Sequence, residues 1–583
     1  MTPSAPSPRL TEWQATALSG NNMLSAVFYA AGFSAAVGGT MAPILLLAVA
    51  GLLAAFRSVF LEIIGLFPAS GGAYQALLNA TSKPIAAVAG ALALLSCLAT
   101  AAVSVRTAVA MAGDGFGFSF SNTDGLIFGG ILMAATAFIV ALGVRDAARA
   151  ASGLFGLHVV TLTAIGGLGL LAAASGNAPA LALNEAWTLA RASGGISSVA
   201  TLWLPAFGIS VLAISGLESA SGYVEQLPRG GLGPLLRNLL LGCAIFTPLL
   251  AALLLRFFPT EYLAQHPEAS ILDLARILGG DGFAMFVAID AVLVLLGATL
   301  ASFVGATDLV RRMSLDRVLP SLLRRGDLFP ASARAVAAVS AAAFGMLLAT
   351  GGHLPPLASA YAMSFLGTIG LLATALLVLR HTRPEMPRPF RASPFAVLVA
   401  LGGSALGFIG AILLDPEALV PFATFLFPIL AFSTAVMMKR DLIQTCMPIL
   451  SPIPILGAWA RRKWQQAVDD EIFIFIREHG RLWSILDYLR KNEGTWKIAL
   501  VHFDAESDAN ARKLDELLGG LKASGFLPHL QHRIIHWPEP FHPESVARFR
   551  GRHGADPSRI FMGSIHHGHP FAYEDFGGVR IIF

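Results

Sequence analysis

The sequence predicts an all-α membrane bundle of twelve transmembrane helices, followed by a small α/β domain. Hydrophobic residues make up 55% of the 583 residues and charged residues only 13%, with a mean hydropathy of +0.67, whereas soluble proteins carry roughly 25% charged residues. Charged residues are scarce in the long apolar runs of residues 1–440 and ordinary in frequency after residue 460. The first part is therefore expected to lie in a lipid bilayer and the second in water.

The apolar runs have about the 20 residues that an α-helix needs to cross the hydrocarbon core. Only helices and closed barrels satisfy every backbone polar group in lipid, and continuously apolar runs select helices. We expect spans at residues 19–38, 41–66, 84–112, 122–143, 152–174, 197–222, 235–257, 282–308, 332–350, 356–379, 394–414 and 418–438.

Positive charges in the short loops predict the orientation. With the N-terminus inside, the loop Lys and Arg residues fall mainly on the inner side, and Arg191 and Arg276 are the outer-loop exceptions. This is the bias that cytoplasmic loops show. An even number of spans returns the chain to the same side, so we expect a multi-pass protein of the inner (plasma) membrane with both termini cytoplasmic.

The chain after the last span is expected to have two parts. Residues 441–468 are rich in proline, and we interpret them as an interfacial linker whose Arg461, Arg462 and Lys463 face anionic lipid headgroups. Residues 469–583 are expected to form a cytosolic α/β domain with strands at 471–476, 497–503, 531–537 and 579–583 and helices at 482–491 and 508–522. The net charge of +4 does not favour nucleic acid as a partner.

Three motifs carry a family resemblance. Glu62 to Tyr74 is EIIGLFPASGGAY, Ser215 to Ala220 is SGLESA and precedes Glu225, and Gly297 to Pro320 ends in DLVRRMSLDRVLP. In this order and spacing they resemble signatures of the amino acid–polyamine–organocation superfamily across residues 19–440. The resemblance implies a LeuT-like fold, with a five-plus-five inverted repeat, two added helices, and spans one and six unwound at the midplane.

These two spans contain polar, helix-weak residues within apolar runs. A broken helix at membrane depth exposes backbone groups that can hold the charged parts of a substrate. We therefore expect substrate-binding residues there, with close helix packing as the alternative role of small residues. They are Gly20, Asn21, Asn22, Ser25 and Tyr29 in span one, and Ser215, Gly216 and Glu218 in span six; Thr100, Ser104 and Tyr361 are added from the second resemblance given below. Ser19, Ser210 and Ser219 also interrupt these apolar runs.

Ionisable residues within spans are costly in lipid and point to function. Glu218 is interpreted either as a structural acid or as a group that binds substrate or a proton. His158 lies in span five, where the sequence resembles proton-coupled permeases that have a lysine, and a histidine can exchange a proton near neutral pH. We assign proton coupling to His158 and Glu218, with a merely hydrogen-bonded histidine as the alternative. Arg57 and Glu62 could pair, and Asp290 has no partner that the sequence identifies.

Two substrate classes stay open. The first span, GNNMLSAVFYAAG, has less glycine than the amino-acid carriers of the superfamily. It resembles instead the first span of KUP-type potassium importers, which also have polar residues matching Thr100 and Ser104 and a span-ten tyrosine that falls near Tyr361. However, the two acids of those importers are replaced by Asn22 and Ser96, which disfavours potassium because the attraction of two carboxylates is lost.

The C-terminal domain carries a further resemblance. LWSILDYLRKNEGTW followed by KIALVHF, and the closing GGVRIIF, resemble the cytosolic domain of cation–chloride cotransporters. The resemblance implies a regulatory domain or a homodimer contact. No phosphate-binding loop is found, and His566, His567 and His569 lack the cysteine or carboxylate partners of a metal site. We expect neither a metal nor a cofactor.

The expected function is secondary active transport, proton-coupled, of an amino acid or related small organic solute by alternating access. An inorganic-ion (potassium) transporter and a membrane ligand sensor are the alternatives. The expected partners are a small-molecule or ion substrate, protons and the lipid bilayer. An enzyme is not expected, because no nucleophile–base pair or metal triad is found at the span ends.

Overall fold

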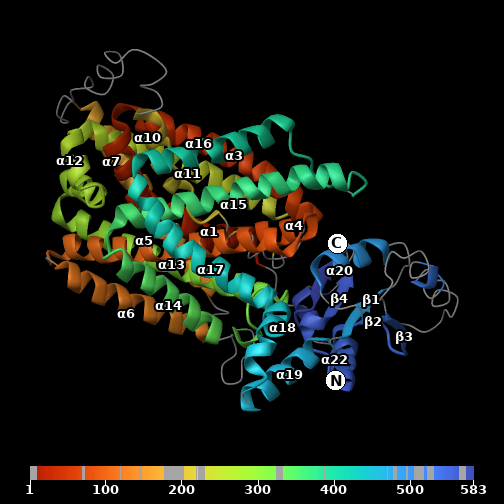
Figure 1. Cartoon of the computed structure of the whole chain (residues 1–583). Helices are drawn as coiled ribbons and strands as arrows, with labels where there is room; N and C mark the ends of the chain where they lie inside the picture. The colour runs from red at the N-terminus through yellow and green to blue at the C-terminus, as the bar shows by residue number, and fades with distance from the viewer. Residues whose placement is uncertain are drawn as a thin grey trace.

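The computed structural model contains a helical bundle and a smaller α/β domain, here called the tail domain (Figure 1). The structure describes residues 10–67, 72–118, 120–142, 147–175, 202–217, 220, 227, 230–323, 333–386, 388–452, 454–468, 471–476, 482–493, 497–503, 516, 518–520, 531–563, 571 and 573–582. Within these residues, nine helical stretches are long and apolar enough to cross a membrane. A bundle of membrane helices is therefore confirmed, whereas the count of twelve and the inverted repeat stay predictions.

The first half of the helical bundle alternates long helices with short connections. Its elements are α1 (Glu12–Ser25), α2 (Val27–Gly38), η1 (Gly39–Met41), α3 (Ala42–Leu66), α4 (Gly72–Ala80), α5 (Lys83–Phe116), α6 (Asn122–Ala141), α7 (Ala147–Ala174), α10 (Leu204–Ser210) and η3 (Val211–Ile214). The stretch Glu12–Leu66 contains two of the expected spans, and the expected span at 197–222 overlaps a shorter apolar helix, Leu204–Ile214.

The second half continues this pattern. Its elements are α11 (Leu232–Phe257), α12 (Thr260–Gln265), α13 (Ser270–Leu315), η5 (Ser321–Leu323), α14 (Ala333–Ala349), α15 (Leu354–Thr382), α16 (Pro394–Leu414), η6 (Pro416–Ala418) and α17 (Leu419–Met437). Gly280 (φ 76°, ψ −174°) breaks α13 near its start, and the helix is regular from there to Leu315. The part of α13 after Gly280 is therefore one continuous helix.

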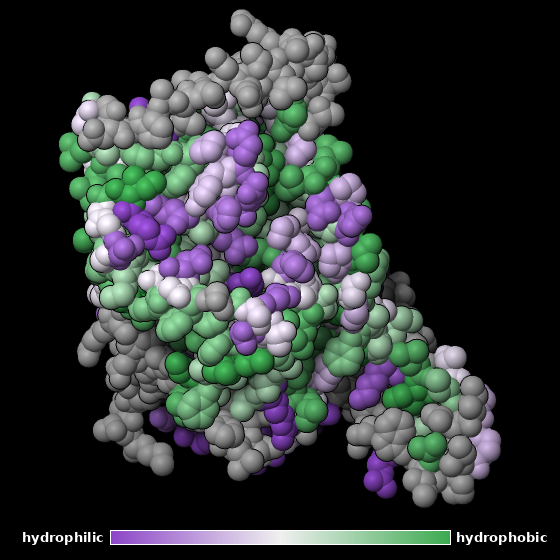
Figure 2. Space-filling model, turned by 90° about the vertical axis from the view of Figure 1, so that its left-hand side faces the viewer, coloured by the Kyte–Doolittle hydropathy of each residue, from purple (hydrophilic) through white to green (hydrophobic). Residues whose placement is uncertain are grey.

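Small residues let the helices approach closely, as expected where lipid supplies no hydrophobic drive for association. At the crossing of α10 and α16, a Cβ on Gly208 would lie 2.5 Å from the backbone nitrogen of Ala411, and one on Gly410 would lie 2.9 Å from the carbonyl carbon of Leu204. Viewed onto the end that carries α12, hydrophilic residues gather across the middle of the bundle between hydrophobic surfaces (Figure 2). This end of the bundle therefore carries a group of hydrophilic residues.

Two helices connect the bundle to the tail domain: α18 (Lys439–Leu450) and α19 (Pro454–Val468). The tail domain contains β1 (Glu471–Phe475), α20 (Leu482–Asn492), β2 (Lys497–Phe503), β3 (Gln531–Trp537), α22 (Pro543–His553), η8 (Pro557–Arg559), β4 (Ile560–Gly563), η9 (Tyr573–Phe576) and β5 (Arg580–Ile582). Most of the helix expected at 508–522 lies outside the described residues.

The five strands form one parallel sheet in the order β3-β2-β1-β4-β5. The four expected strands are present, and β4 and α22 are additional. Parallel strands need crossover connections, so helices lie between them in sequence. Strand β1 lies at the centre of the sheet, and the later strands lie outward from it on both sides. Because all the strands are parallel, their amino ends lie together at one end of the sheet.

Candidate functional site

Span six loses its helix at Ser215 and Gly216. The α-helix α10 ends at Ser210 and continues as one 3-10 turn to Ile214. Ser215 then takes an extended conformation (φ −56°, ψ 137°), and Gly216 has a φ of +87°, a left-handed value that favours glycine. The interruption expected at these two residues is present, while Glu218 and Ser219 lie outside the described residues.

Span one differs from the expectation. Ser19 to Asn22 are helical within α1, so the unwinding expected there is wrong. The helix assignment is interrupted only at Ala26, between α1 and α2, and Ala26 keeps right-handed dihedrals (φ −61°, ψ −21°). The Ser25 hydroxyl donates to the carbonyl of Asn22 at 2.9 Å. Because these residues are buried among neighbouring helices, packing outweighs their low helix propensity.

Four of the expected site residues meet where spans one, three and six converge. A Cβ on Gly216 would lie 2.6 Å from Nδ2 of Asn22, so the amide of Asn22 lies directly against Gly216. On the other side, the hydroxyls of Thr100 and Ser215 are 3.4 Å apart. Asn22 Oδ1 is buried and has no hydrogen-bond partner among the described residues. We call Asn22, Thr100, Ser215 and Gly216 the Asn22 cluster.

Gly20 and Asn21 contact α7 instead. A Cβ on Gly20 would lie 2.8 Å from the ring of Phe155, and Asn21 donates from Nδ2 to the carbonyl of Ala151 at 2.9 Å. These two residues therefore pack span one against span five. Their contacts place them on a different face of α1 from Asn22.

The remaining expected residues are buried on their own helices. Tyr29 lies on α2 and Tyr361 on α15, where its ring stacks on Phe365 with centroids 5.5 Å apart. Ser104 lies one turn after Thr100 on α5, and its hydroxyl has no partner among the described residues.

His158 and Asp290 form a fully buried pair. Nδ1 of His158 on α7 is 2.8 Å from Oδ2 of Asp290 on α13, and both side chains are 0% exposed. The imidazole also lies beside the ring of Phe28 on α2, with centroids 5.2 Å apart. His158 Nε2 and Asp290 Oδ1 have no hydrogen-bond partner in the described part of the chain. The sequence singled out both residues but could not pair them, because they are 132 positions apart.

Glu62 is the second buried acid with defined partners. It accepts from Nε of Arg380 at 3.0 Å and from the backbone N–H of Ala392 at 2.7 Å, and Arg388 Nε lies 3.3 Å away. The expected pairing with Arg57 is wrong, because Arg57 donates instead to the carbonyl of Gly233 at 3.3 Å. Glu62 thus joins the end of α3 to the end of α15 and to the connection that leads into α16.

Metal ligands do not gather at these sites. Within the described ranges, no group of three or more His, Cys, Asp or Glu side chains could hold a metal ion. The Asn22 cluster instead presents hydroxyl, amide and backbone groups, and the His158–Asp290 pair presents groups that exchange protons.

Comparison with known proteins gives two findings. A family described as "Amino acid permease" matches residues 10–438. The chain is also similar to a protein named branched-chain amino acid permease BcaP from Bacillus subtilis (strain 168), with 28% identity over 214 residues. The aligned part covers 36% of this chain and 43% of that protein, so the chain spans less than half of the relative's length in this match.

Proposed function

Because this chain belongs to the amino acid permease family, a family of transporters rather than enzymes, we propose that it is a proton-coupled secondary transporter that moves an amino acid by alternating access. The observation that supports proton coupling is the buried His158–Asp290 pair, in which Nδ1 of His158 lies 2.8 Å from Oδ2 of Asp290. The substrate site proposed is the Asn22 cluster, at the break in span six.

Proton coupling follows from where the pair lies. His158 is on α7 and Asp290 is on α13, and both helices pack against α1, which carries Asn22. A proton that leaves the pair strands a carboxylate in the interior, so loss of the proton is favourable only in a state that admits water. Binding and release of the proton are thereby tied to which side of the bundle is open, the requirement for symport.

We propose an apolar amino acid as the substrate. The hydroxyls of Thr100 and Ser215 and the amide of Asn22 offer partners for the amino and carboxylate groups. Ile214 and Leu217, which flank the break, are fully buried and apolar, and they suit an aliphatic side chain. The name of the Bacillus subtilis relative, a branched-chain amino acid permease, points the same way.

The orientation is also a proposal. The tail domain contacts the beginning of α5 and the end of α13 through Lys83 and Asp316, so these ends lie on the same side of the bundle as the tail domain. The loops at this end hold the excess of Lys and Arg, which favours the cytoplasmic side of the inner membrane. The tail domain as a homodimer contact remains a second, independent proposal.

The test is uptake of labelled leucine into proteoliposomes with an imposed pH gradient. One pH unit is worth about 1.4 kcal/mol per proton, so coupling to one proton supports roughly tenfold accumulation. Asp290→Asn and His158→Gln are expected to abolish accumulation but to retain exchange of labelled for unlabelled leucine, because exchange needs no net proton movement. Thr161→Ala is the matched control, since Thr161 is buried one turn further along α7 and donates only to its own helix, at Leu157.

Each outcome separates a part of the proposal. Accumulation by Asp290→Asn equal to that of the unchanged protein removes the pair from coupling. If the unchanged protein binds leucine but never accumulates it, with or without a pH gradient, the result contradicts transport and favours a ligand sensor. Uptake of potassium in place of any amino acid contradicts the proposed substrate class.

A further inference from the structure

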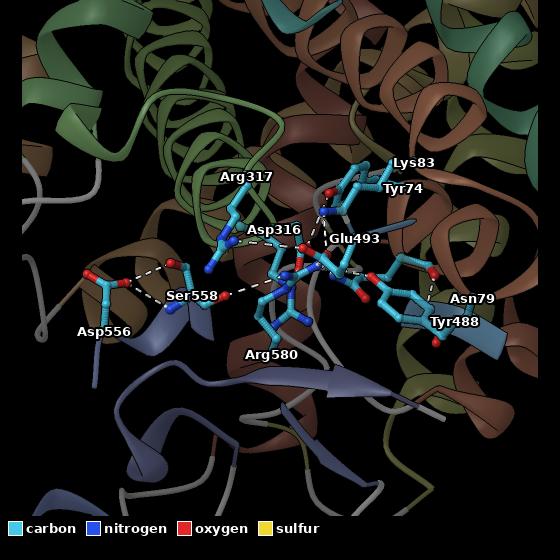
Figure 3. Close-up of polar contacts among 12 residues, drawn as sticks. Tyr74, Asn79, Lys83, Asp316, Arg317, Tyr488, Glu493, Asp556, Ser558 and Arg580 are labelled. Atoms are coloured by element: carbon cyan, nitrogen blue, oxygen red, sulfur yellow. Dashed lines mark hydrogen bonds and ion pairs between the residues drawn. The ribbon is translucent and has the colours of Figure 1, made fainter. Parts of the chain in front are cut away.

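A buried charge cluster joins the tail domain to the helical bundle, the proposed transport domain (Figure 3). At its centre is Arg580, the first residue of β5, which is 0% exposed. Its guanidinium donates to Asp316 Oδ1 at 3.1 Å, lies 2.6 Å from Glu493 Oε1, and is 4.1 Å from the ring centroid of Phe561. Asp316 follows α13 in the transport domain, so Arg580 crosses the junction between the two domains.

On the side of the helical bundle, residues from two helices contact Asp316. Asp316 Oδ2 accepts from Tyr74 and Gln75 of α4, each at 3.2 Å, and Arg312 Nε on α13 lies 3.3 Å from it. Asp316 is thus shared between α4, α13 and the tail domain. A single carboxylate holds all three together.

Glu493 makes the matching connection to α5. Its Oε1 accepts from Nζ of Lys83 at 2.5 Å, and Arg317 Nη1 lies 3.9 Å from its other oxygen. The backbone N–H of Lys83 also donates to Asn492 Oδ1 at 2.7 Å. We call Lys83, Asp316, Glu493 and Arg580 the junction cluster.

Glu493 and Arg580 keep each other charged. Burial raises the pKa of Glu493, but Arg580 first, and then Lys83 and Arg317, outweigh it and hold the pKa at about 2. Burial likewise lowers the pKa of Arg580, and Glu493 raises it above its ordinary value. These two residues therefore stay charged near neutral pH.

The junction cluster lies at one end of α13 and the His158–Asp290 pair lies further along the same helix. No residue between Asp290 and Leu315 departs from helical dihedrals. The 26 residues from Asp290 to Asp316 correspond to about 39 Å of helix. A regular helix transmits displacement along its axis, so a constraint on the end at Asp316 acts on the position of Asp290.

We propose that the docked tail domain restrains transport, because Arg580 holds α4 and α13 together through Asp316 and thereby opposes opening of this side of the bundle. The tail domain is then an inhibitory clamp that must undock for full activity. A tail domain that merely travels with α5 and α13 as a passive body is the competing interpretation. The inference uses the proposed transport activity as its readout, but docking itself is measured separately.

The first experiment releases the clamp. Arg580→Met keeps the length of the side chain and removes the charge, and it is expected to raise the maximal rate of leucine uptake at least threefold with an unchanged KM. Arg533→Met is the matched control: Arg533 on β3 makes two 2.7 Å bonds to Glu471 within the tail domain. Size-exclusion chromatography verifies that both variants are folded.

The second experiment locks the clamp. The 2.7 Å contact between the Lys83 backbone and the Asn492 side chain makes Lys83→Cys with Asn492→Cys a suitable disulfide pair, in a Cys446→Ser background because Cys97 and Cys243 are buried. Oxidation is expected to lower the rate of leucine uptake at least tenfold relative to the reduced protein, and dithiothreitol is expected to restore the rate. The yield of the disulfide reports docking without any transport assay.

The results decide between clamp and passive body. Full uptake by the oxidised, cross-linked protein overturns the proposal, and so does an Arg580→Met variant that cross-links poorly yet transports at the unchanged rate. Absence of leucine uptake in every protein, with normal cross-linking, contradicts the proposed function instead. Loss of folding in Arg580→Met leaves the cross-linking experiment to decide.

Discussion

Replacing Gly216 by alanine tests the geometry of the Asn22 cluster most directly. The new Cβ would meet two obstacles: a backbone with φ of +87°, and the Asn22 amide, whose Nδ2 lies 2.6 Å from the Cβ position. The left-handed backbone costs an L-residue about 1–2 kcal/mol, and overpacking of a filled interior adds about 1–3 kcal/mol. We expect Gly216→Ala to destabilise the protein by about 2–5 kcal/mol and to abolish leucine uptake.

A matched control separates the two terms. Gly230 has a similar φ of +77°, but nothing lies within 4 Å of its Cβ position. Gly230→Ala is therefore expected to cost only the backbone term, about 1–2 kcal/mol. The double variant Asn22→Ala with Gly216→Ala removes the clash and is expected to recover the overpacking term, about 1–3 kcal/mol, as a coupling energy.

The assay is denaturant titration of the detergent-solubilised protein, followed by uptake in proteoliposomes. If Gly216→Ala is as mild as Gly230→Ala, the side chain of Asn22 does not press against Gly216. In that case spans one and six do not meet as described, and the substrate site proposed there is refuted.

Two further predictions concern the buried acids. Glu62→Gln leaves Arg380 and Arg388, whose side chains are 15% and 11% exposed, without their countercharge. It is expected to lower the free energy of unfolding by about 3–5 kcal/mol in the same titration. The control is Glu417→Gln at an exposed position, expected to change this free energy by less than about 0.5 kcal/mol, and equal stability of the two variants contradicts the buried ion pair. Because the pKa of Glu493 is about 2 in the fold, below its ordinary value of 4.5, its contribution of about 3 kcal/mol is complete above pH 4.5 and is lost as the pH falls toward 2. The thermal midpoint of the tail domain is expected to be flat from pH 5 to 8 and to fall below pH 4, and Glu493→Gln is expected to reduce this fall; an identical acid transition in that variant excludes Glu493 as a cause.

Local signals in the sequence were sufficient for most elements of the fold. Apolar runs predicted the membrane helices, and alternating apolar segments predicted four of the five strands. The strand β4 was not predicted because Ile560–Gly563 is only four residues long and pairs with β1 and β5, which are distant in sequence. The unwinding at Ser19–Asn22 was wrong because propensity is a weak term once a helix is buried on several sides.

The site was predictable only in part. Polar residues in apolar runs singled out Asn22, Ser215 and Gly216 before their contacts were known. The pairing of His158 with Asp290 depends on how α7 packs on α13, and no local pattern encodes that packing. The junction cluster did leave a trace, because Arg580 is a charged residue in the otherwise apolar closing strand VRIIF. Such a residue is rarely buried unless it is paired.

The sheet contacts the bundle at the amino ends of two strands. Arg580 begins β5 and donates to Asp316, and Glu493 precedes β2 and pairs with Lys83. The carboxyl ends of the strands, such as Phe475 of β1 and Gly563 of β4, lie at the opposite end of the sheet. A five-residue strand such as β1 is about 16 Å long, so this end lies about that far from the end that contacts the bundle. A displacement of the sheet is therefore expected to act on Asp316 and, through it, on the end of α13.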